Sequence, residues 1–491
     1  MKPEDLMIKD RKKKLDALRK EGVNPYPYHF EHKDHAVDLL KKFEYLGNHE
    51  ETQHEVSLAG RLMTHRVMGK AGFAHLQDQT GRIQIYVRED VLGEKNYKHF
   101  ATTDLGDIVG VKGTIFRTKM GEITIKAKMF ELLAKCLRPL PEKWHGLKDM
   151  EQRYRYRYLD LISNPEVKEI FFKRSKILNT VRSVLDRQGF LEVDTPVLQP
   201  LYGGANARPF KTFLHDLKMD VYMRVSDELY LKRLVVGGFE KVYELGRDFR
   251  NESIDRTHNP EFTMMECYWA FADYHDVMEL TQEIFTTVAK EVLGKSTFDY
   301  QGHQINMKSP WERLTMKEAL KKHASIEFDK LKDGDLKKLA KQHKLDIDDK
   351  SSNGVVMAAL FDELVEEHLI QPTFITDYPC ETTPLCKPKR DGPEEIIERF
   401  ELFIAGMEFA NAYSELNDPI LQKKFFEMQK KNIKKDEQHP VDMDYLKAME
   451  YGMPPMGGLG IGMDRMIMLF TNSASIRDVI LFPFMKVEEN Q

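Results

Sequence analysis

Two short segments constrain this chain most, because each places an arginine among residues typical of a protein interior. The first is the segment 244–262, which contains Arg250, and the second is the glycine-rich segment 457–465, which ends at Arg465. A guanidinium group is costly to bury unless an anion accompanies it. Together with His258 and nearby acidic residues, the two arginines predict a site for a polyphosphate.

Length and composition indicate a cytoplasmic-type protein with at least two domains. The chain has 491 residues, of which 41% are hydrophobic and 31% charged, and a net charge of −5. No apolar run reaches the roughly 18–20 residues of a membrane span, and the N-terminus has no apolar signal region. The four cysteines contain no CxxC pair, which favours reduced thiols over a zinc site. We therefore expect no membrane segment and a cytoplasmic location.

Residues 1–50 are expected to form a helical N-terminal extension. Residues 9–20 are basic and of helical composition, and the helix should end before Gly22, ahead of two prolines. Two interpretations of this basic segment stay open. It is either a solvated helix face or a surface that contacts a phosphate backbone.

Residues 51–136 have the pattern of a small barrel. Five strands begin near residues 56, 72, 82, 108 and 123, and a helix near 92–101 separates the third strand from the fourth. This order is that of an OB-type barrel, a fold that often binds single-stranded nucleic acid through an exposed strand face. An ordinary barrel with a polar outer face is the alternative. The candidate binding residues are Arg61, Arg66, Phe73, His75 and Gln77.

The remaining sequence is expected to be a linker and a second domain. Residues 137–150 contain prolines and a glycine typical of a linker. Residues 151–491 alternate helices and strands without a regular βαβ rhythm, which predicts an α+β domain with a largely antiparallel sheet flanked by helices. Residues 316–350 are rich in lysine and aspartate and should form a helical surface insertion.

The strand predicted over residues 262–271 carries one charge among apolar residues, Glu266. Its odd-numbered members from residue 265 are all apolar, so Glu266 and Tyr268 should share the opposite face. A carboxylate in such a strand needs a partner. The partner is either a base of the same chain or a cationic ligand.

A hairpin is predicted around the turn formed by residues 405–406. Phe403 would oppose Glu408, so that Glu401 is a diagonal neighbour of Glu408. Two close carboxylates repel unless a cation joins them, and oxygen ligands suit Mg²⁺. Strict alternation puts Asn411, Tyr413 and Glu415 on the face opposite Glu408, so only a bend or bulge would let both groups line one cavity.

The glycines of segment 457–462 do not form a standard nucleotide loop, because the segment lacks both a βαβ context and a P-loop lysine. Two interpretations stay open. The glycines either form a tight junction between a strand and a helix, or they let the strand approach a ligand closely.

Taken together, these residues resemble the class II aminoacyl-tRNA synthetases, and most closely the lysyl-tRNA synthetase family. Segment 189–196 is similar to the first class II motif, 249–262 to the second and 458–465 to the third. The resemblance covers nearly the whole chain. It implies a class II antiparallel sheet domain behind an OB-type anticodon-binding barrel, and a homodimer formed through the first motif.

The resemblance also implies a pocket for L-lysine. Glu228 and Glu266 would hold the α-amino end of the amino acid, and Tyr268 and Glu415 its ε-ammonium group. Asn411 and Tyr413 would complete the wall. An acid-lined pocket suits an ammonium group, whose three donors require carboxylate and hydroxyl acceptors.

The implied reaction joins lysine to ATP, giving lysyl-adenylate and pyrophosphate, and then transfers lysine to the 3′ end of tRNA(Lys). Catalysis would consist of positioning and charge stabilisation. Arg250 would bind the α-phosphate and Arg465 the γ-phosphate, and Phe73 of the barrel would stack on an anticodon base. Phe262 would stack on adenine, Glu252 would accept from its amino group, His258 and Asn259 would complete the ATP site, and Glu401 and Glu408 would hold Mg²⁺.

The chain departs from the family pattern at Thr257, at the pair Met456-Gly457 and in the segment around Cys386. A synthetase for aspartate or asparagine would need a cationic or amide-reading residue instead of the acids at 266 and 415. A non-catalytic RNA-binding protein on the same scaffold should have lost the phosphate-binding residues, which are all present. A paralogue that lysylates a protein would lack the barrel.

Overall fold

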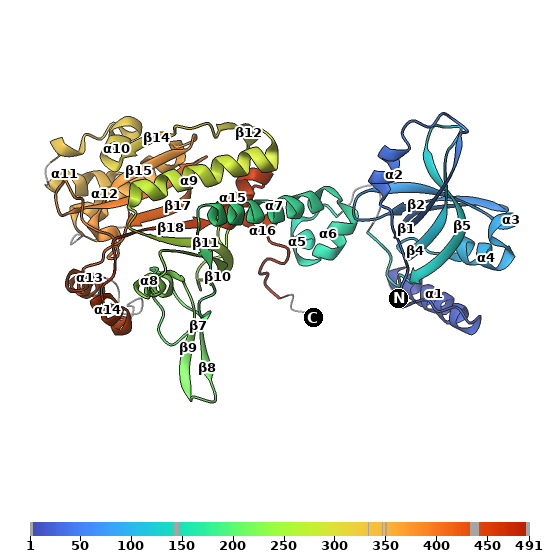
Figure 1. Ribbon diagram of the computed structural model, residues 1–491, viewed down its shortest axis with the longest axis horizontal. Helices are drawn as coiled ribbons and strands as arrows, with labels where there is room; N and C mark the ends of the chain where they lie inside the picture. The colour runs from blue at the N-terminus through green and yellow to red at the C-terminus, as the bar shows by residue number, and fades with distance from the viewer. Residues whose placement is uncertain are drawn as a thin grey trace. The chain divides into compact units, whose positions relative to one another are not determined.

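The computed structural model describes residues 3–141, 147–331, 333–345, 347–348, 351–432 and 441–487. The chain forms two compact units, Met1–Pro165 and Glu166–Gln491 (Figure 1). Residues 151–165 thus belong to the first unit, whereas the sequence pattern assigns them to the second domain. Parts of two predicted segments lie outside the described residues: 142–146 of the linker, and 332, 346 and 349–350 of the helical insertion.

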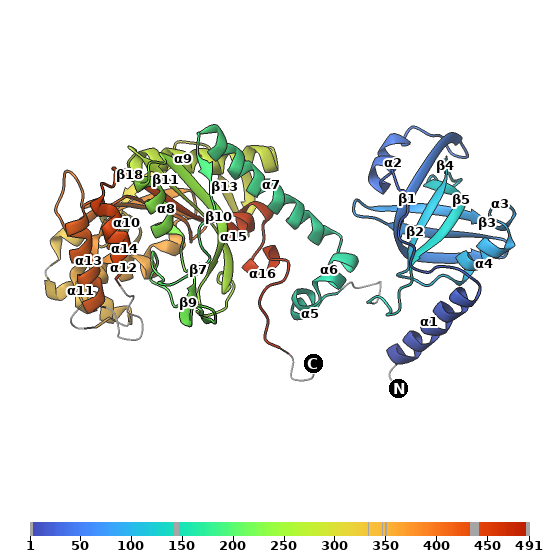
Figure 2. The same ribbon diagram turned by 60° about the horizontal axis from the view of Figure 1, so that its bottom comes forward.

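The first unit contains a closed barrel with the strand order β1-β2-β3-β5-β4 (Figure 2). Alternate residues point inward, so that leucine, isoleucine and valine side chains fill the barrel. The predicted five strands, with a helical segment between the third and the fourth, are confirmed. The bounds are β1 Glu51–Met68, β2 Ala71–Gln77, β3 Arg82–Arg88, α3 Glu89–Leu92, α4 Glu94–Thr102, β4 Ile108–Arg117 and β5 Ile123–Ala134.

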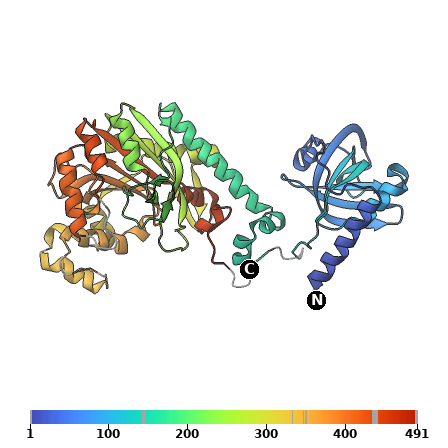
Figure 3. The same cartoon turned by 90° about the horizontal axis from the view of Figure 1, so that it is seen from below.

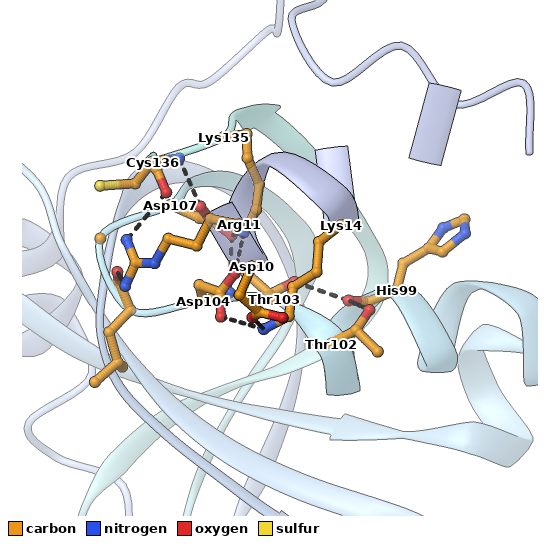
Figure 4. Close-up of polar contacts among 12 residues, drawn as sticks. Asp10, Arg11, Lys14, His99, Thr102, Thr103, Asp104, Asp107, Lys135 and Cys136 are labelled. Carbon is orange, nitrogen blue, oxygen red and sulfur yellow. Dashed lines mark hydrogen bonds and ion pairs between the residues drawn. The ribbon is translucent and has the colours of Figure 1, made fainter. Parts of the chain in front are cut away.

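The basic N-terminal segment forms helix α1, Pro3–Lys20, and Gly22 follows it with a positive φ. Two of its cations attach it to the barrel (Figure 4). Arg11 donates to the carbonyl oxygens of Leu105, Cys136 and Arg138. Lys14 contacts Asp104 at 2.7 Å, and the buried Lys135 joins the cluster through Asp104 and Asp107. The unit also contains α2 Ala36–Lys42, α5 Met150–Arg155 and α6 Arg157–Ser163.

The second unit is built on an eight-stranded sheet with the order β14-β15-β16-β17-β18-β11-β10-β6. Only the pairs β14–β15 and β10–β6 at its two edges are parallel, so the predicted largely antiparallel α+β domain is confirmed. The strands are β6 Leu191–Glu192, β10 Lys241–Phe249, β11 Glu261–Ala270, β14 Glu312–Thr315, β15 Thr373–Pro379, β16 Ile396–Ile404, β17 Met407–Ser414 and β18 Met456–Gly462.

Helices cover both faces of this sheet (Figure 1). On one face, α7, α9 and α15 pack on apolar residues that include Met265 and Cys267 of β11. Figure 3 shows the long α7 running beside the sheet. On the other face, α8, α13 and α14 leave uncovered some of the strand residues that point away from this apolar layer. The helices are α7 Glu166–Arg187, α8 Glu228–Val236, α9 Tyr274–Val288, α13 Pro419–Asn432, α14 Met443–Glu450, α15 Met463–Thr471 and α16 Ile476–Val479, and η1 Ala289–Leu293 continues α9.

The predicted helical insertion is only partly a surface element. Its first helix, α10 (Met316–Ala324), buries Met316, Ala319 and Leu320, whose i, i+3, i+4 spacing forms one apolar face. These residues form a hydrophobic cluster with α12 (Asn353–Leu364) and strands β15 and β16. The remaining elements are α11 Asp333–Gln342, the hairpin β12 Thr297–Tyr300 and β13 His303–Asn306, and a small sheet of β7 Leu198–Gln199, β8 Lys211–Leu214 and β9 Met219–Met223; η2 Phe328–Lys330, η3 Glu366–His368 and η4 Cys380–Thr382 are short 3₁₀ turns.

Within the described ranges, no helix combines the length and the apolar character that crossing a bilayer requires.

Candidate active site and nucleic-acid-binding face

Two adjoining cavities lie on the face of the eight-stranded sheet that α8 and α14 leave open. We call the first, of about 350 Å³, the acidic cavity, and the second, of about 250 Å³, the arginine cavity. Their common wall contains Arg250, Glu408 and Asn411. The acidic cavity is lined by Glu228, Glu266, Tyr268, Glu401, Tyr413 and Glu415, and the arginine cavity by Glu252, His258, Asn259, Phe262 and Arg465. All residues predicted for the amino acid, ATP and metal sites therefore line one cavity or the other.

A β-bulge explains how Glu408 and Asn411 come to share a cavity. The turn at residues 405–406 has positive φ at both positions, as a two-residue hairpin requires, and Phe403 pairs with Glu408 as predicted. The register then shifts, because Leu402 pairs with Ala410 and leaves one extra residue in β17. That residue reverses the parity of the strand, so Glu408 and Asn411 face the same side.

Glu266 is buried in the acidic cavity without a cationic partner. It accepts hydrogen bonds from Ser226 Oγ at 2.9 Å and from Tyr268 Oη at 3.1 Å, and it forms no ion pair among the described residues. Burial, reinforced by the charges of Asp248 and Glu228, raises the pKa of Glu266 to about 7. Of the two interpretations left open by the sequence, an internal ion pair is therefore wrong for this residue.

Glu415, by contrast, has an internal partner. Lys232 of α8 is fully buried, donates to Glu228 Oε1 at 2.5 Å and forms an ion pair with Glu415. Although burial alone lowers the pKa of an ammonium group, the two carboxylates raise that of Lys232 well above its usual value. No role for Lys232 was predicted from the sequence. Its i, i+4 spacing from Glu228 on one helix could have indicated that pair, but nothing local indicates Glu415.

The glycines of β18 leave room for the walls of the acidic cavity. A Cβ atom added to Gly458 would lie 1.9 Å from Glu415 Oε1 and 2.6 Å from the ring of Tyr268. Any larger residue would therefore displace two cavity residues. The close approach at Gly458 therefore involves two protein side chains, and the glycine run is a tight junction that also leaves space beside the cavity.

Arg250 and Arg465 both face the arginine cavity. The guanidinium carbon of Arg250 lies 5.1 Å from the centroid of the Phe262 ring, and its Nε contacts the carbonyl oxygen of Val225 at 3.4 Å. Arg465 donates to the carbonyl oxygen of Glu408 at 2.7 Å, and its Nη2 lies 3.5 Å from His258 Nε2. Two guanidinium groups and an imidazole thus converge on one space, an arrangement suited to a polyphosphate.

Asp464 and Asn259 hold the wall of the arginine cavity in place through contacts that the sequence did not indicate. Asp464 is buried and accepts from Arg174 Nη1 and from the backbone N–H of Thr263, each at 2.6 Å, which ties α15 to α7 and β11. The Asn259 amide donates to the carbonyl oxygen of Glu261 and accepts from the N–H of Phe484. Asn259 therefore also anchors the C-terminal segment to the cavity wall. Glu252 is exposed at the rim.

The predicted metal ligands, Glu401 and Glu408, both line the acidic cavity, and Glu408 also belongs to the common wall. Glu401 accepts from Tyr378 Oη at 2.7 Å and contacts Arg399, which fixes its orientation. Burial and the negative charge of Glu408 raise the pKa of Glu401, whereas the positive charge of Arg399 acts to lower it. Two oxygen ligands that still repel each other fit a hard divalent cation such as Mg²⁺.

The barrel presents an aromatic strip formed by residues of β2, β3 and β4. The ring of Phe73 stacks on Tyr86, with centroids 4.6 Å apart, and Tyr86 lies 5.9 Å from Phe116. Tyr86 and Phe116 were not among the predicted binding residues, although the alternation of the third strand already points Tyr86 outward with Gln84. Among the other candidates, Arg66 is exposed beside Phe73, and His75 contacts Thr64 and Glu122.

Two barrel candidates are engaged within the protein. Gln77 is buried, donates to the carbonyl oxygen of Ile162 and accepts from Arg82. Arg61 donates to the carbonyl oxygen of Gly106 at 2.7 Å. Both residues therefore support the barrel rather than extend the aromatic strip.

The departures from the family pattern lie partly in the walls of the cavities and partly behind them. Cys386 is fully buried, and its backbone bridges that of Glu415. A Cβ atom added to Gly457 would lie 2.8 Å from the carbonyl oxygen of Asp273. Met456 is buried in the cluster that packs on α8 and α14. Thr257 lines the arginine cavity, and Thr383, Pro384 and Leu385 of the segment around Cys386 line the acidic cavity.

Comparisons with known proteins agree with both units. Residues 149–486 match the family described as tRNA synthetases class II (D, K and N), and residues 56–133 match the OB-fold nucleic acid binding domain. A lysine–tRNA ligase of Pelotomaculum thermopropionicum is 53% identical over 99% of this chain and 96% of its own length. Lysine–tRNA ligases of Halalkalibacterium halodurans and Oceanobacillus iheyensis are each 52% identical, over 98% and 97% of this chain and 97% and 98% of their own lengths.

Proposed function

The chain belongs to the lysine–tRNA ligase family of class II tRNA synthetases, and we propose that its two adjoining cavities activate L-lysine with ATP and pass it to tRNA(Lys). The observation that carries this proposal is the opposite charge of the two cavities on one sheet face. The acidic cavity suits a basic amino acid, and the arginine cavity suits a triphosphate. Arg250, in the common wall, lies where the two substrates would meet.

The reaction requires no protein nucleophile. The lysine carboxylate attacks the α-phosphorus of ATP, the new C–O–P bond forms, and the bond to pyrophosphate breaks. Arg250 would stabilise the negative charge that develops on the α-phosphate, and Arg465 with His258 would bind the outer phosphates. Phe262 offers a flat apolar surface for adenine, and Glu252 at the rim an acceptor for its amino group. Glu401 and Glu408 would hold Mg²⁺, which would neutralise phosphate charge.

In the acidic cavity, Glu266 and Glu228 would receive the α-ammonium group, and Glu415 with Tyr268 the ε-ammonium group. Asn411 and Tyr413 line the same wall, and the Asn411 amide donates to Tyr413 Oη at 3.1 Å. These acceptors disfavour an acidic or amide side chain, because neither would satisfy buried carboxylates. The same argument sets lysine apart from aspartate and asparagine.

The barrel is proposed to bind the anticodon. Phe73, with Tyr86 and Phe116, forms the stacking surface, and the exposed Arg66 lies beside it to contact phosphate. His75 is the remaining candidate on this strand face.

A homodimer in the cytoplasm is proposed as the working form. Large apolar side chains are exposed along β6–β9, as expected of a surface that a second copy covers; they are Leu191, Val197, Leu198, Leu201, Phe213, Leu214 and Leu217. The four cysteines are free, which supports a reducing compartment. Sedimentation analysis of the Leu198→Glu variant tests the dimer. We expect the variant to shift towards monomer, and an unchanged sedimentation profile would place the interface elsewhere.

ATP–pyrophosphate exchange with each of the twenty amino acids tests the proposed function. Lysine alone should support rapid exchange, and charging should require tRNA(Lys). Exchange with aspartate or asparagine in place of lysine, or no exchange with any amino acid, would refute the proposal.

A further inference from the structure

Lys232 is a buried charge at the acidic cavity to which the proposed function gives no role. Its Nζ atom lies between the carboxylates of Glu228 and Glu415, and 5.6 Å from the centroid of the Tyr268 ring. The side chain is fully buried, so water cannot share its hydrogen bonds. It sits where three residues proposed to bind lysine meet.

The cation is needed because these carboxylates are buried and close together. Two ionised carboxylates in such a place repel each other, and without a counter-ion one of them takes up a proton. A neutral carboxyl group cannot hold the ammonium group of a substrate as an ion pair. The charge of the cavity before lysine arrives therefore depends on Lys232.

The two oxygens of Glu415 are used differently. Oε2 forms the ion pair with Lys232, whereas Oε1 points towards Gly458, where an added Cβ would lie only 1.9 Å away. Since Gly458 has no side chain, Oε1 faces the space beside Tyr268. One oxygen is thus committed to the protein and the other is left for a ligand.

We propose that Lys232 is a positioning residue that sets the amino acid specificity: it balances the charge of Glu228 and so keeps Glu415 ionised, with Oε1 turned towards the ε-ammonium group of bound lysine. This inference rests on the proposed function of the acidic cavity. Lys232, which sets the specificity, thus carries the same positive charge as the side chain of the substrate.

The groups around Glu415 agree with this role. Burial and the charge of Glu228 raise the pKa of Glu415, and the ion pair with Lys232 opposes this rise, so loss of Lys232 should favour the neutral acid. The other titratable or charged groups near the pair come from several elements; they are Asp227 beside α8, Glu266 and Tyr268 of β11, Tyr413 of β17, Tyr445 of α14, Cys386, and Arg399 of β16.

The test measures lysine-dependent ATP–pyrophosphate exchange at pH 6.5–9 for the full-length wild type, Lys232→Met and Lys232→Arg. Met keeps the approximate volume of lysine without its charge, and Arg keeps the charge in a larger side chain. We expect Lys232→Met to raise KM for lysine roughly 100-fold at pH 7 with KM for ATP nearly unchanged, and this defect to shrink towards pH 9. Lys232→Arg should keep the wild-type pH profile. Lys241→Met, which removes a lysine stacked on Trp269 and bonded to Gln188, controls for general loss of packing.

Three outcomes are distinguishable. If the wild type shows no lysine-dependent exchange, the proposed function itself fails, and the inference with it. If the wild type exchanges but Lys232→Arg is worse than Lys232→Met, or the Met defect is independent of pH and lowers kcat with both KM values, Lys232 has a packing role and the inference alone is refuted. If Lys232→Met fails to fold by thermal melting, Lys232→Arg decides: an altered pH profile overturns the inference, and a retained profile supports it.

Discussion

The two cavities treat charge in opposite ways, although they share a wall. The acidic cavity contains its own counter-ion, Lys232, and its carboxylates are nearly fully buried. In the arginine cavity, Arg250 forms no ion pair within the described ranges, and Arg465 pairs only with the half-exposed Glu408 at 3.6 Å. A small ammonium group must replace water at carboxylates whose negative charge Lys232 already balances in part. A triphosphate brings several charges at once, so its site can leave guanidinium groups without a buried carboxylate partner.

Loss of Arg250 should have the largest effect, because no other cation lies in the common wall of the two cavities. Arg250→Ala is expected to reduce kcat/KM in the exchange assay roughly 30- to 4,000-fold, the equivalent of about 2–5 kcal/mol. Arg247→Ala is the matched control, since Arg247 lies in β10, which ends one residue before Arg250, and pairs with the exposed Glu261. Equal losses in both variants would show that the arginine cavity is not the ATP site.

In the acidic cavity, Glu266→Gln should mainly weaken lysine binding. Gln keeps the shape but loses the charge, so KM for lysine should rise roughly 10- to 100-fold while KM for ATP stays within about two-fold. Steady-state exchange kinetics measure both constants, and Glu261→Gln, exposed on the same strand, serves as the control. A selective rise in KM for ATP instead would reverse the assignment of the two cavities.

The barrel should affect only the second step of the reaction. Phe73→Ala removes one ring of the stack with Tyr86. It should lower kcat/KM for tRNA charging by the equivalent of about 1–3 kcal/mol. ATP–pyrophosphate exchange should remain near the wild-type rate, because it does not involve tRNA. Tyr45→Ala, which removes an aromatic ring exposed elsewhere in the first unit, is the control. Equal loss of charging and exchange in Phe73→Ala would contradict this division.

A smaller effect of pH is expected in the acidic cavity alone. The pKa of Glu266, about 7, lies above its usual 4.5, so this carboxyl is partly protonated near neutral pH. Lysine binding should release this proton, and KM for lysine should fall several-fold as pH rises from 6 to 9, with KM for ATP little changed. This carboxyl also destabilises the fold as pH rises from 4.5 to about 7, so lysine should raise Tm more at pH 8.5 than at pH 6. Equal thermal shifts at the two pH values would contradict the charge state assigned to this cavity.

Much of the fold is predictable from local patterns, whereas the contacts that bring the site residues together are not. Alternation places Glu266 and Tyr268 opposite an apolar face, and the positive-φ turn at residues 405–406 fixes the start of the hairpin. The bulge that brings Glu408 to the side of Asn411 has no local signal, because it depends on how β17 pairs with both neighbours. The contact between Lys232 and Glu415 joins segments far apart in sequence. For the same reason, the sequence of the strand that contains Gln77 does not indicate that this side chain is buried against the carbonyl oxygen of Ile162.

A crystal structure of the chain with a non-hydrolysable lysyl-adenylate analogue tests the central claim most directly. The account predicts the lysyl ammonium group at Glu415 and Tyr268 in the acidic cavity, the adenosine against Phe262 in the arginine cavity, and the group that replaces the phosphate at Arg250. An analogue bound in the reverse direction, or one whose phosphate replacement lies away from Arg250, would contradict it.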